Sequence, residues 1–374
     1  MKSCLFIMHS FGGGAEKVAL QLAQYLHLRN YRITLACVRH IPALARHAPV
    51  DVPLYMPAKP GKWAALRNIL HIRRLARCSD AVLGSLELQS IFWAALFAPG
   101  RALGWLHKDI AGYLTQKGKF YGWLYRHLLG LALRRCRIIV CVSKGIMKSS
   151  ACLWPDLNAC LRLLWNPVDI EGIRTCTAFP LPDGLRPIFT KPVVLGVGRL
   201  EEQKAFHLLL EAHAILLARG LDCHCCILGE GSQRTLLEDK IRRLGLEGKA
   251  FLPGFMEPYQ AMAQACVLAL SSLYEGSPLV IVEALSIGLQ IVAVDCPSGL
   301  KEILNKEKYG VLVPMGDTAA LAQALEEVLH AVPDATAKVA RMARAEKFAL
   351  QPALEAWTNT LMTIVPDTPQ PPPG

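Results

Sequence analysis

Short apolar β-rich runs alternate with amphipathic helical runs along most of this chain, and this alternation limits the folds it can adopt. The first three runs are "CLFIM" at 4–8, "AEKVALQLAQYLHL" at 15–28 and "RITLACV" at 32–38, and the pattern resumes from "PVVLGVG" at 192–198. Strands separated by helices of this length usually pair in parallel, with the helices covering the sheet. The sequence therefore predicts an α/β fold built on parallel sheets.

A chain of 374 residues is too long for one ordinary domain, so we expect two. The alternation stops before residue 192, where "FPLPDGLRP" at 179–187 contains three prolines and a glycine. The predicted segments are a first domain at 1–170, a linker at 171–191, a second domain at 192–345, a C-terminal helix at 346–365 and a disordered proline-rich tail at 366–374. One interpretation is that the C-terminal helix crosses back to pack on the first domain.

Charge is divided unevenly between the two halves of the chain. Residues 1–170 contain 23 Lys and Arg against 7 Asp and Glu, a balance of +16, whereas the remainder contains 18 against 23, a balance of −5. Such a basic half could contact nucleic acid, an anionic membrane surface or a phosphorylated substrate. Composition alone does not choose among the three.

Several features point to the cytoplasm. No window reaches the roughly 18 uninterrupted apolar residues of a membrane-spanning helix, and residues 1–8 contain too short an apolar run for a signal peptide. The 13 cysteines are odd in number and mostly lie in strand-like runs, which indicates a reducing compartment. The "CHCC" at 223–226 has no second ligand pair at zinc-site spacing, so we predict no metal there.

Glycines follow the first predicted strand. Gly12, Gly13 and Gly14 permit a tight turn and leave backbone N–H groups open at a helix N-terminus, where an anion can bind; a simple turn is the alternative. The run lacks the third glycine of G-x-G-x-x-G, and the second strand is followed by Arg39 and His40 instead of an acid for a ribose. These departures disfavour a nicotinamide dehydrogenase.

The second predicted sheet begins with "GVGRLEEQK", in which Arg199 follows a strand and Lys204 precedes a helix. Two cations beside helix N–H groups suit a diphosphate, although either cation alone is more often a solvated surface charge. Two later loops, at Gly229 to Gly231 and at Gly254 with Phe255, contain glycines that leave room for a flat base.

Glu275 and Glu283 stand eight residues apart in "YEGSPLVIVEAL" at 274–285. Two helical turns take roughly 7.2 residues, so the two carboxylates can project in nearly one direction. We expect Pro278 in the first helical turn and Ser277 as its N-cap. The alternative is a capping acid and a solvated surface charge.

These motifs, taken in order, resemble those of the retaining glycosyltransferases of family 4 (GT4). The E-x7-E pair, the R-L-x-x-x-K segment, "LGEG", "LPGF" and the "NPVD" at 166–169 occur at the approximate spacing of that family, and the resemblance runs from about residue 10 to about residue 305. It is greatest to bacterial enzymes that assemble surface polysaccharides or lipid-linked glycans. The resemblance implies the GT-B fold, in which two Rossmann-like doubly wound domains face each other across a cleft.

The resemblance also implies roles for individual residues. The catalytic group would contain Glu275, which holds the hydroxyls of the transferred sugar, and His107, which lines the cleft from the first domain; Asp109 is a doubtful participant because Lys108 separates it from His107. The diphosphate group would contain Arg199, Lys204, Gly13, Gly14, Gly276, Ser277 and Leu279. The nucleoside group would contain Glu283, on the ribose hydroxyls, with Gly229 and Phe255. No metal or other cofactor is expected, and no Asp-x-Asp triplet occurs in the chain.

The implied reaction is transfer of a hexosyl or N-acetylhexosaminyl group, with retention, from a nucleotide-diphosphate sugar, with UDP as the expected nucleotide. The implied acceptor is a lipid-linked glycan, lipopolysaccharide or polysaccharide. Two alternatives stay open: a basic nucleic-acid-binding protein, for which no reader motif is present, and a catalytically inactive GT-B scaffold. Nucleic acid is not an expected partner.

Residues 116–137, "QKGKFYGWLYRHLLGLALRRCR", combine six Lys or Arg with four aromatic residues and a leucine series. This composition is typical of a helix that rests in an anionic lipid surface, and an ordinary helix with its apolar side in the core is the alternative. With the basic first half, it predicts peripheral attachment to the cytoplasmic face of the plasma membrane.

Overall fold

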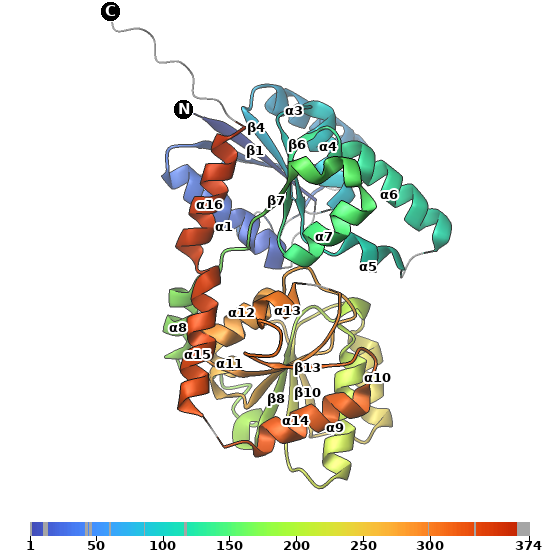
Figure 1. Ribbon diagram of the computed structural model, residues 1–374, viewed down its shortest axis with the longest axis vertical. Coiled ribbons are helices and arrows are strands. Elements are labelled where there is room, and N and C mark those ends of the chain that lie inside the picture. The colour runs from blue at the N-terminus through green and yellow to red at the C-terminus, as the bar shows by residue number, and fades with distance from the viewer. Residues whose placement is uncertain are drawn as a thin grey trace, which may run out of the picture. The chain divides into compact units, whose positions relative to one another are not determined.

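The computed structural model describes residues 2–9, 14–41, 44, 47–59, 61–85, 87–115, 118–297, 299–332 and 334–364 of the chain (Figure 1). The chain forms two compact units, the first comprising Met1–Pro167 with Gln351–Gly374 and the second comprising Val168–Leu350. The predicted tail at 366–374 lies outside the described residues.

The segment expected to be a linker, 171–191, is part of the second unit. It contains most of α8 (Ile170–Thr177) and the short 3-10 helix η2 (Ile188–Thr190). Ile173, Leu185 and Ile188 are buried, so this proline-rich stretch adds apolar surface to a core instead of spanning solvent. The predicted C-terminal helix corresponds to α16 (Leu350–Met362), most of which belongs to the first unit.

The first unit contains a seven-stranded sheet in which all the strands pair in parallel, in the order β3-β2-β1-β4-β5-β6-β7. The strands are β1 (Ser3–Met8), β2 (Arg32–Cys37), β3 (Leu54–Tyr55), β4 (Ala81–Ser85), β5 (Ala102–Leu106), β6 (Cys136–Cys141) and β7 (Leu161–Leu163). The helices between them are α1 (Gly14–Leu28), α3 (Lys62–Arg77), α4 (Glu87–Phe97), α5 (Ile110–Thr115), α6 (Lys119–Leu133), α7 (Lys144–Leu153) and the 3-10 helix η1 (Pro155–Cys160).

The second unit contains a six-stranded parallel sheet in the order β10-β9-β8-β11-β12-β13. Its strands are β8 (Val193–Val197), β9 (His224–Leu228), β10 (Ala250–Gly254), β11 (Val267–Leu270), β12 (Gln290–Val294) and β13 (Val311–Val313). Its helices after α8 are η3 (Glu202–Lys204), α9 (Phe206–Ala218), α10 (Arg234–Arg243), α11 (Tyr259–Gln264), α12 (Leu279–Ser286), α13 (Leu300–Ile303), α14 (Thr318–His330), α15 (Ala335–Ala345) and η4 (Glu346–Phe348).

The strands are almost continuously apolar because helices cover both faces of parallel sheets. Leu5, Phe6 and Ile7 of β1 are fully buried, and α16 closes the same core by packing Trp357 on Trp105 with ring centroids 4.2 Å apart. The strand order reverses between β1 and β4 in the first unit and between β8 and β11 in the second. Open parallel sheets bind ligands at the carboxyl ends of strands beside such reversals.

Candidate active site

The loops that follow β8 and β11 lie at the reversal of the second sheet. The loop after β8 contains Arg199 and continues into η3, which ends at Lys204, and the loop after β11 contains Glu275 and Gly276. β8 and β11 are adjacent and parallel, so their carboxyl ends meet at one edge of the sheet. The fold thus brings together two groups of predicted site residues that are about 70 positions apart in the chain.

Lys204 and Glu275 form a buried ion pair. Lys204 Nζ lies 2.7 Å from Glu275 Oε1, and the two side chains are only 15% and 8% exposed. Ser272, which is fully buried, donates a hydrogen bond of 2.7 Å to the same carboxylate oxygen. A lysine ammonium has three N–H donors, so the pair holds Nζ in place and leaves donors for a further anion.

Backbone contacts fix the two loops to each other. Leu273 N donates to Gln203 O at 2.8 Å, and the Gln203 side-chain amide donates to Tyr274 O at 2.9 Å. Ser271 Oγ donates to Lys204 O at 2.8 Å. These bonds fix the position of the lysine relative to the glutamate, so the two loops together hold the ion pair in place.

Two glycines make room for this arrangement of loops. A Cβ at Gly198 would lie 2.9 Å from Lys204 Cε, so the glycine lets the lysine side chain pass across the end of β8. A Cβ at Gly229 would lie 1.8 Å from Gly198 O, so the loop after β9 could not approach with any side chain there. The predicted site residue Gly229 is therefore required by backbone packing, whatever else it contacts. Arg199 is exposed on the adjoining turn.

The loops after β9 and β10 adjoin this site in the sheet order. Arg234 holds Glu230 of "LGEG" through two hydrogen bonds, of 2.6 and 2.9 Å, and its guanidinium lowers the pKa of that carboxyl. Arg234, the first residue of α10, also donates to Leu252 O of β10 at 3.1 Å, which ties the start of that helix to the neighbouring strand. Phe255 follows Gly254 and is 76% exposed, so its ring is accessible to a flat ligand.

Helix α12 begins one residue later than expected. Pro278 is its N-cap and Leu279 its first residue, and no side chain caps it, so the assignment of Ser277 as N-cap is wrong. Glu283 lies just over one turn into the helix and is half-buried, whereas Glu275 lies in the preceding loop. Helical spacing therefore does not relate the two carboxylates, because only one of the two glutamates is helical. Gly276 is buried, and Ser277 and Leu279 are half-buried at the start of the helix.

Arginines from outside the sheet bind the carbonyl end of α12. Arg174 Nε donates to Ser286 O at 3.0 Å, and Arg341 Nε donates to Gly288 O at 2.9 Å. Glu346 pairs with Arg174 at 2.9 Å and holds it in place. Cations at this end oppose the partial negative charge of the helix C-terminus.

Two predicted site residues, Gly14 and His107, belong to the first unit, and Gly13 lies outside the described residues. Gly14 is the first residue of α1, after the first strand, and is exposed. His107 follows β5 and packs on Trp105 with ring centroids 4.4 Å apart. Both His107 ring nitrogens are shielded from solvent and have no hydrogen-bond partner among the described residues. Burial lowers the pKa of His107 to about 3, so the ring is neutral.

Asp109, the doubtful participant, has a local structural role. Its carboxylate accepts a hydrogen bond of 2.7 Å from Gly112 N, in the first turn of α5, and one of 2.5 Å from Ser149 Oγ of α7. Both carboxylate oxygens are therefore occupied in joining two helices.

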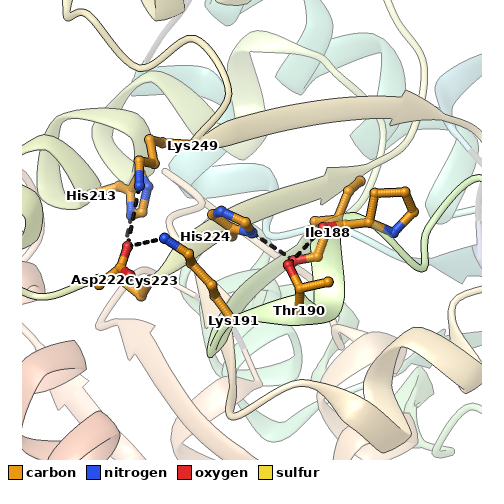
Figure 2. A network of polar contacts seen from close by, with 9 residues as sticks. Ile188, Thr190, Lys191, His213, Asp222, Cys223, His224 and Lys249 are labelled. Carbon is orange, nitrogen blue, oxygen red and sulfur yellow. Dashed lines mark hydrogen bonds and ion pairs between the residues drawn. The ribbon is translucent and has the colours of Figure 1, made fainter.

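In the "CHCC" segment, Cys223 stands directly before β9 and the other three residues begin that strand, and the side chains of Cys223 and His224 have partners inside the second unit (Figure 2). His224 Nδ1 is 2.7 Å from Ile188 O, and Cys223 Sγ is 3.9 Å from His213 Nδ1. Burial raises the pKa of the Cys223 thiol to about 11. Over the ranges that the structure describes, no three or more His, Cys, Asp and Glu side chains gather in a way that could hold a metal ion.

The sequence did not single out several residues that support the site. They are Gln203, Ser271, Ser272, Arg174, Arg234 and Arg341. Ser271 and Ser272 carried a weak signal, because two serines directly after an apolar strand are polar groups at a buried strand end. The arginines carried none, since each acts on a carbonyl or carboxylate of another element.

Comparison with known proteins identifies the class that this fold and site define. Residues 186–347 match the family model for glycosyl transferases group 1, and residues 12–171 match the model for glycosyltransferase family 4. The amylovoran biosynthesis glycosyltransferase AmsD of Erwinia amylovora is 34% identical over 317 residues, covering 81% of this chain and 83% of that protein. The chain belongs to the GT4-type glycosyltransferases, and the resemblance predicted from its motifs is confirmed.

A second relative is the N-acetylgalactosamine-N,N'-diacetylbacillosaminyl-diphospho-undecaprenol 4-alpha-N-acetylgalactosaminyltransferase of Campylobacter jejuni, 30% identical over 219 residues. The match covers 58% of this chain and 57% of that relative, so the chain spans little more than half of its length. Among solved structures, HepE of Anabaena in complex with UDP-glucose superposes with a TM-score of 0.79 at 20% identity, over 97% of this chain and 100% of that one. The predicted GT-B fold of two Rossmann-like domains is confirmed.

Proposed function

We propose that this glycosyltransferase moves a hexosyl or N-acetylhexosaminyl group, with retention, from a UDP-sugar to a lipid-linked glycan or polysaccharide acceptor. The observation that carries the proposal is the Lys204–Glu275 pair at the strand reversal of the second sheet, directly before α12. The names of the relatives support the substrates: HepE binds UDP and UDP-glucose, AmsD acts in amylovoran biosynthesis, and the Campylobacter enzyme's named acceptor is a diphospho-undecaprenol.

In this proposal the diphosphate lies against Lys204, Arg199 and the N-terminus of α12. Two cations and a helix dipole can neutralise the charge that develops on the departing UDP, so we propose a reaction without a metal ion. Glu283 accepts hydrogen bonds from the ribose hydroxyls, with Gly229 and Phe255 beside the base. The alternatives of a nucleic-acid-binding protein and an inactive scaffold are outcomes of the test below.

In the proposed transfer step, the bonds that break and form belong to the donor and the acceptor, and the protein positions them. The bond from the anomeric carbon to the phosphate oxygen breaks, the acceptor oxygen bonds to the same face of that carbon, and the acceptor proton passes to a phosphate oxygen of the leaving UDP. Glu275 holds the sugar hydroxyls, and the ion pair with Lys204 fixes its carboxylate between sugar and phosphate. His107, neutral at physiological pH, can donate or accept one hydrogen bond per ring nitrogen to a sugar hydroxyl.

A lipid-linked acceptor requires the enzyme to work at a membrane surface. We propose peripheral attachment to the cytoplasmic face of the plasma membrane. None of the helices in the described ranges is both long and apolar enough to cross a membrane.

Nucleotide binding followed by unfolding temperature tests the donor assignment. UDP at about 100 times its dissociation constant should stabilise the protein by about 2.7 kcal/mol, and GDP and ADP should stabilise it less. Glu283→Ala should lose most of the UDP effect, whereas Glu275→Gln should keep it and lose transfer. Equal stabilisation by the three nucleotides, or loss of UDP binding in Glu275→Gln alone, would contradict these assignments. Steeply salt-dependent binding of DNA or RNA, without nucleotide binding, would favour the alternative of a nucleic-acid-binding protein.

Loss of the Arg341 contact should weaken donor binding, although Arg341 lies at the far end of α12 and acts only through that helix. Arg341→Met removes a charged donor from the end of α12, and we expect the free energy of unfolding to fall by about 1.5 kcal/mol and the KM for UDP-sugar to rise about threefold to tenfold, with kcat nearly unchanged. Arg341→Lys should recover part of the affinity. The control is Arg344→Met, one turn along α15, whose Nε donates instead to Ile303 O of α13 at 2.8 Å. If both variants changed KM equally, α12 would not be the element that Arg341 positions.

A further inference from the structure

Three helices of the first unit expose large hydrophobic side chains on one face of its sheet. The connections β3 to β4, β4 to β5 and β5 to β6 all step in the same direction along the sheet, so right-handed crossovers place α3, α4 and α6 on the same face. Helix α4 packs between α3 and α6 (Figure 1). We call the outer surface of these helices the α3–α4–α6 face.

This face holds eleven of the twenty-two large hydrophobic side chains that lie exposed in the described part of the chain. Trp63 of α3, Phe120 of α6 and Trp123 of α6 are 79%, 77% and 56% exposed. Each helix also has a buried side, which in α6 includes Tyr125 and Leu129. The core therefore accounts for one side of each helix, and in the described part of the chain the outer side keeps large apolar side chains exposed.

The charges on the same face are nearly all positive. Lys62–Arg77 contains five Lys and Arg and no Asp or Glu, and residues 119–137 contain the same numbers. Arg67, Arg73, Arg126 and Arg135 are exposed. The one acidic residue in α4 is Glu87. Apolar and aromatic side chains among basic ones, with almost no acids, suit an anionic lipid surface, in which rings insert at the headgroup level and cations pair with phosphates.

We propose that the α3–α4–α6 face docks on an anionic lipid membrane. The proposal deepens the proposed function, since a lipid-linked acceptor would be presented at that membrane. It extends the predicted membrane helix at 116–137 to a surface of three helices, in which Trp63 and Phe92 belong to segments that the sequence did not assign to lipid. A second copy of this chain fits less well, because a symmetric dimer would place two basic faces against each other.

The test is flotation of the full chain with phosphatidylcholine vesicles prepared with and without phosphatidylglycerol. The protein should float with the anionic vesicles, and high salt should release most of it. The variant Trp63→Ser/Phe120→Ser/Trp123→Ser should lower partitioning at least about tenfold. The matched control, Phe179→Ser/Leu236→Ser/Val332→Ser, removes three exposed apolar side chains of the second unit and should bind like the wild type.

A charge variant separates electrostatic from apolar contributions. Arg67→Gln/Arg73→Gln/Arg135→Gln should also lower partitioning at least about tenfold, whereas Arg243→Gln/Lys306→Gln/Lys347→Gln, on the second unit, should not. UDP should raise the unfolding temperature of every variant as it does for the wild type, so a failure of docking is distinguishable from a failure of the donor assignment. Equal binding to neutral and anionic vesicles, binding retained in both face variants, or a dimer that these variants dissociate would overturn the proposal.

Discussion

Replacing Lys204 with methionine is expected to lower the free energy of unfolding by about 3 kcal/mol and to lower turnover at least about tenfold. The stability loss arises because Glu275 stays buried without its cation, and breaking a buried ion pair on one side costs about 3–5 kcal/mol. We expect the lower end of that range because Ser272 still donates to the carboxylate. The loss of turnover arises because a charged contact to a phosphate contributes about 1.5–3 kcal/mol.

The double variant Lys204→Met/Glu275→Gln separates the two effects. Removing both charges leaves no uncompensated ion, so most of the stability should return, while turnover should stay at least as low as in the single variant. Urea unfolding and initial transfer rates measure the two quantities. Recovery of activity together with stability would show that the pair only supports the fold, and near-wild-type turnover in Lys204→Met would remove the lysine from the donor site.

Acidification is expected to destabilise the second unit through His213. This residue is fully buried in α9, and burial lowers its pKa from 6.5 to about 4, although a backbone hydrogen bond with Lys249 acts in the opposite direction. The folded-state pKa lies below the unfolded-state pKa, so only the unfolded chain takes up the proton between pH 6.5 and 4. Stability should therefore be unaffected by this group above pH 7 and should fall by about 3 kcal/mol as the pH approaches 4.

The measurement is urea unfolding between pH 7.5 and 4 for the wild type and for His213→Leu. The free energy of unfolding should fall less steeply with falling pH in the variant, because the variant lacks the one proton that the unfolded wild type takes up at His213. His330→Gln changes an exposed histidine at the end of α14 and is the control. Parallel pH profiles for the wild type and His213→Leu would show that the ring is not kept neutral by the fold.

The sequence predicted the parallel sheets well because each strand is a local apolar run that ends in glycine, serine or a charge. It also placed Arg199 and Glu275 in loops after strands and Lys204 just before a helix, where the structure has them, while their roles toward a donor stay predictions. It could not predict that Lys204 and Glu275 touch each other, because that contact depends on β8 and β11 being neighbours. The role of Arg341 depends in the same way on which helix end it reaches.

Local composition misled at two places. Prolines and glycine at 179–187 signalled turns, but composition does not say which unit the turns pack on, and Leu181 and Leu185 are buried in the second unit. In "GSPLVIVEAL", proline was expected inside the first turn, whereas Pro278 stands just ahead of it. For residues 116–137, α6 has both a core-facing side and an exposed apolar side, and attachment to lipid stays a prediction.

Because α16 returns to the first unit, the two units of this chain are completed in a different order from the one in which they begin. The second unit is one continuous stretch, Val168–Leu350, inserted between two pieces of the first, and Trp357 supplies a fully buried ring to the core around Trp105. During synthesis the second unit, although it starts later, can finish folding while the first unit still lacks its last helix. A ribosome that stops shortly after residue 350 would therefore release a chain whose second unit is whole and whose first unit has an open core.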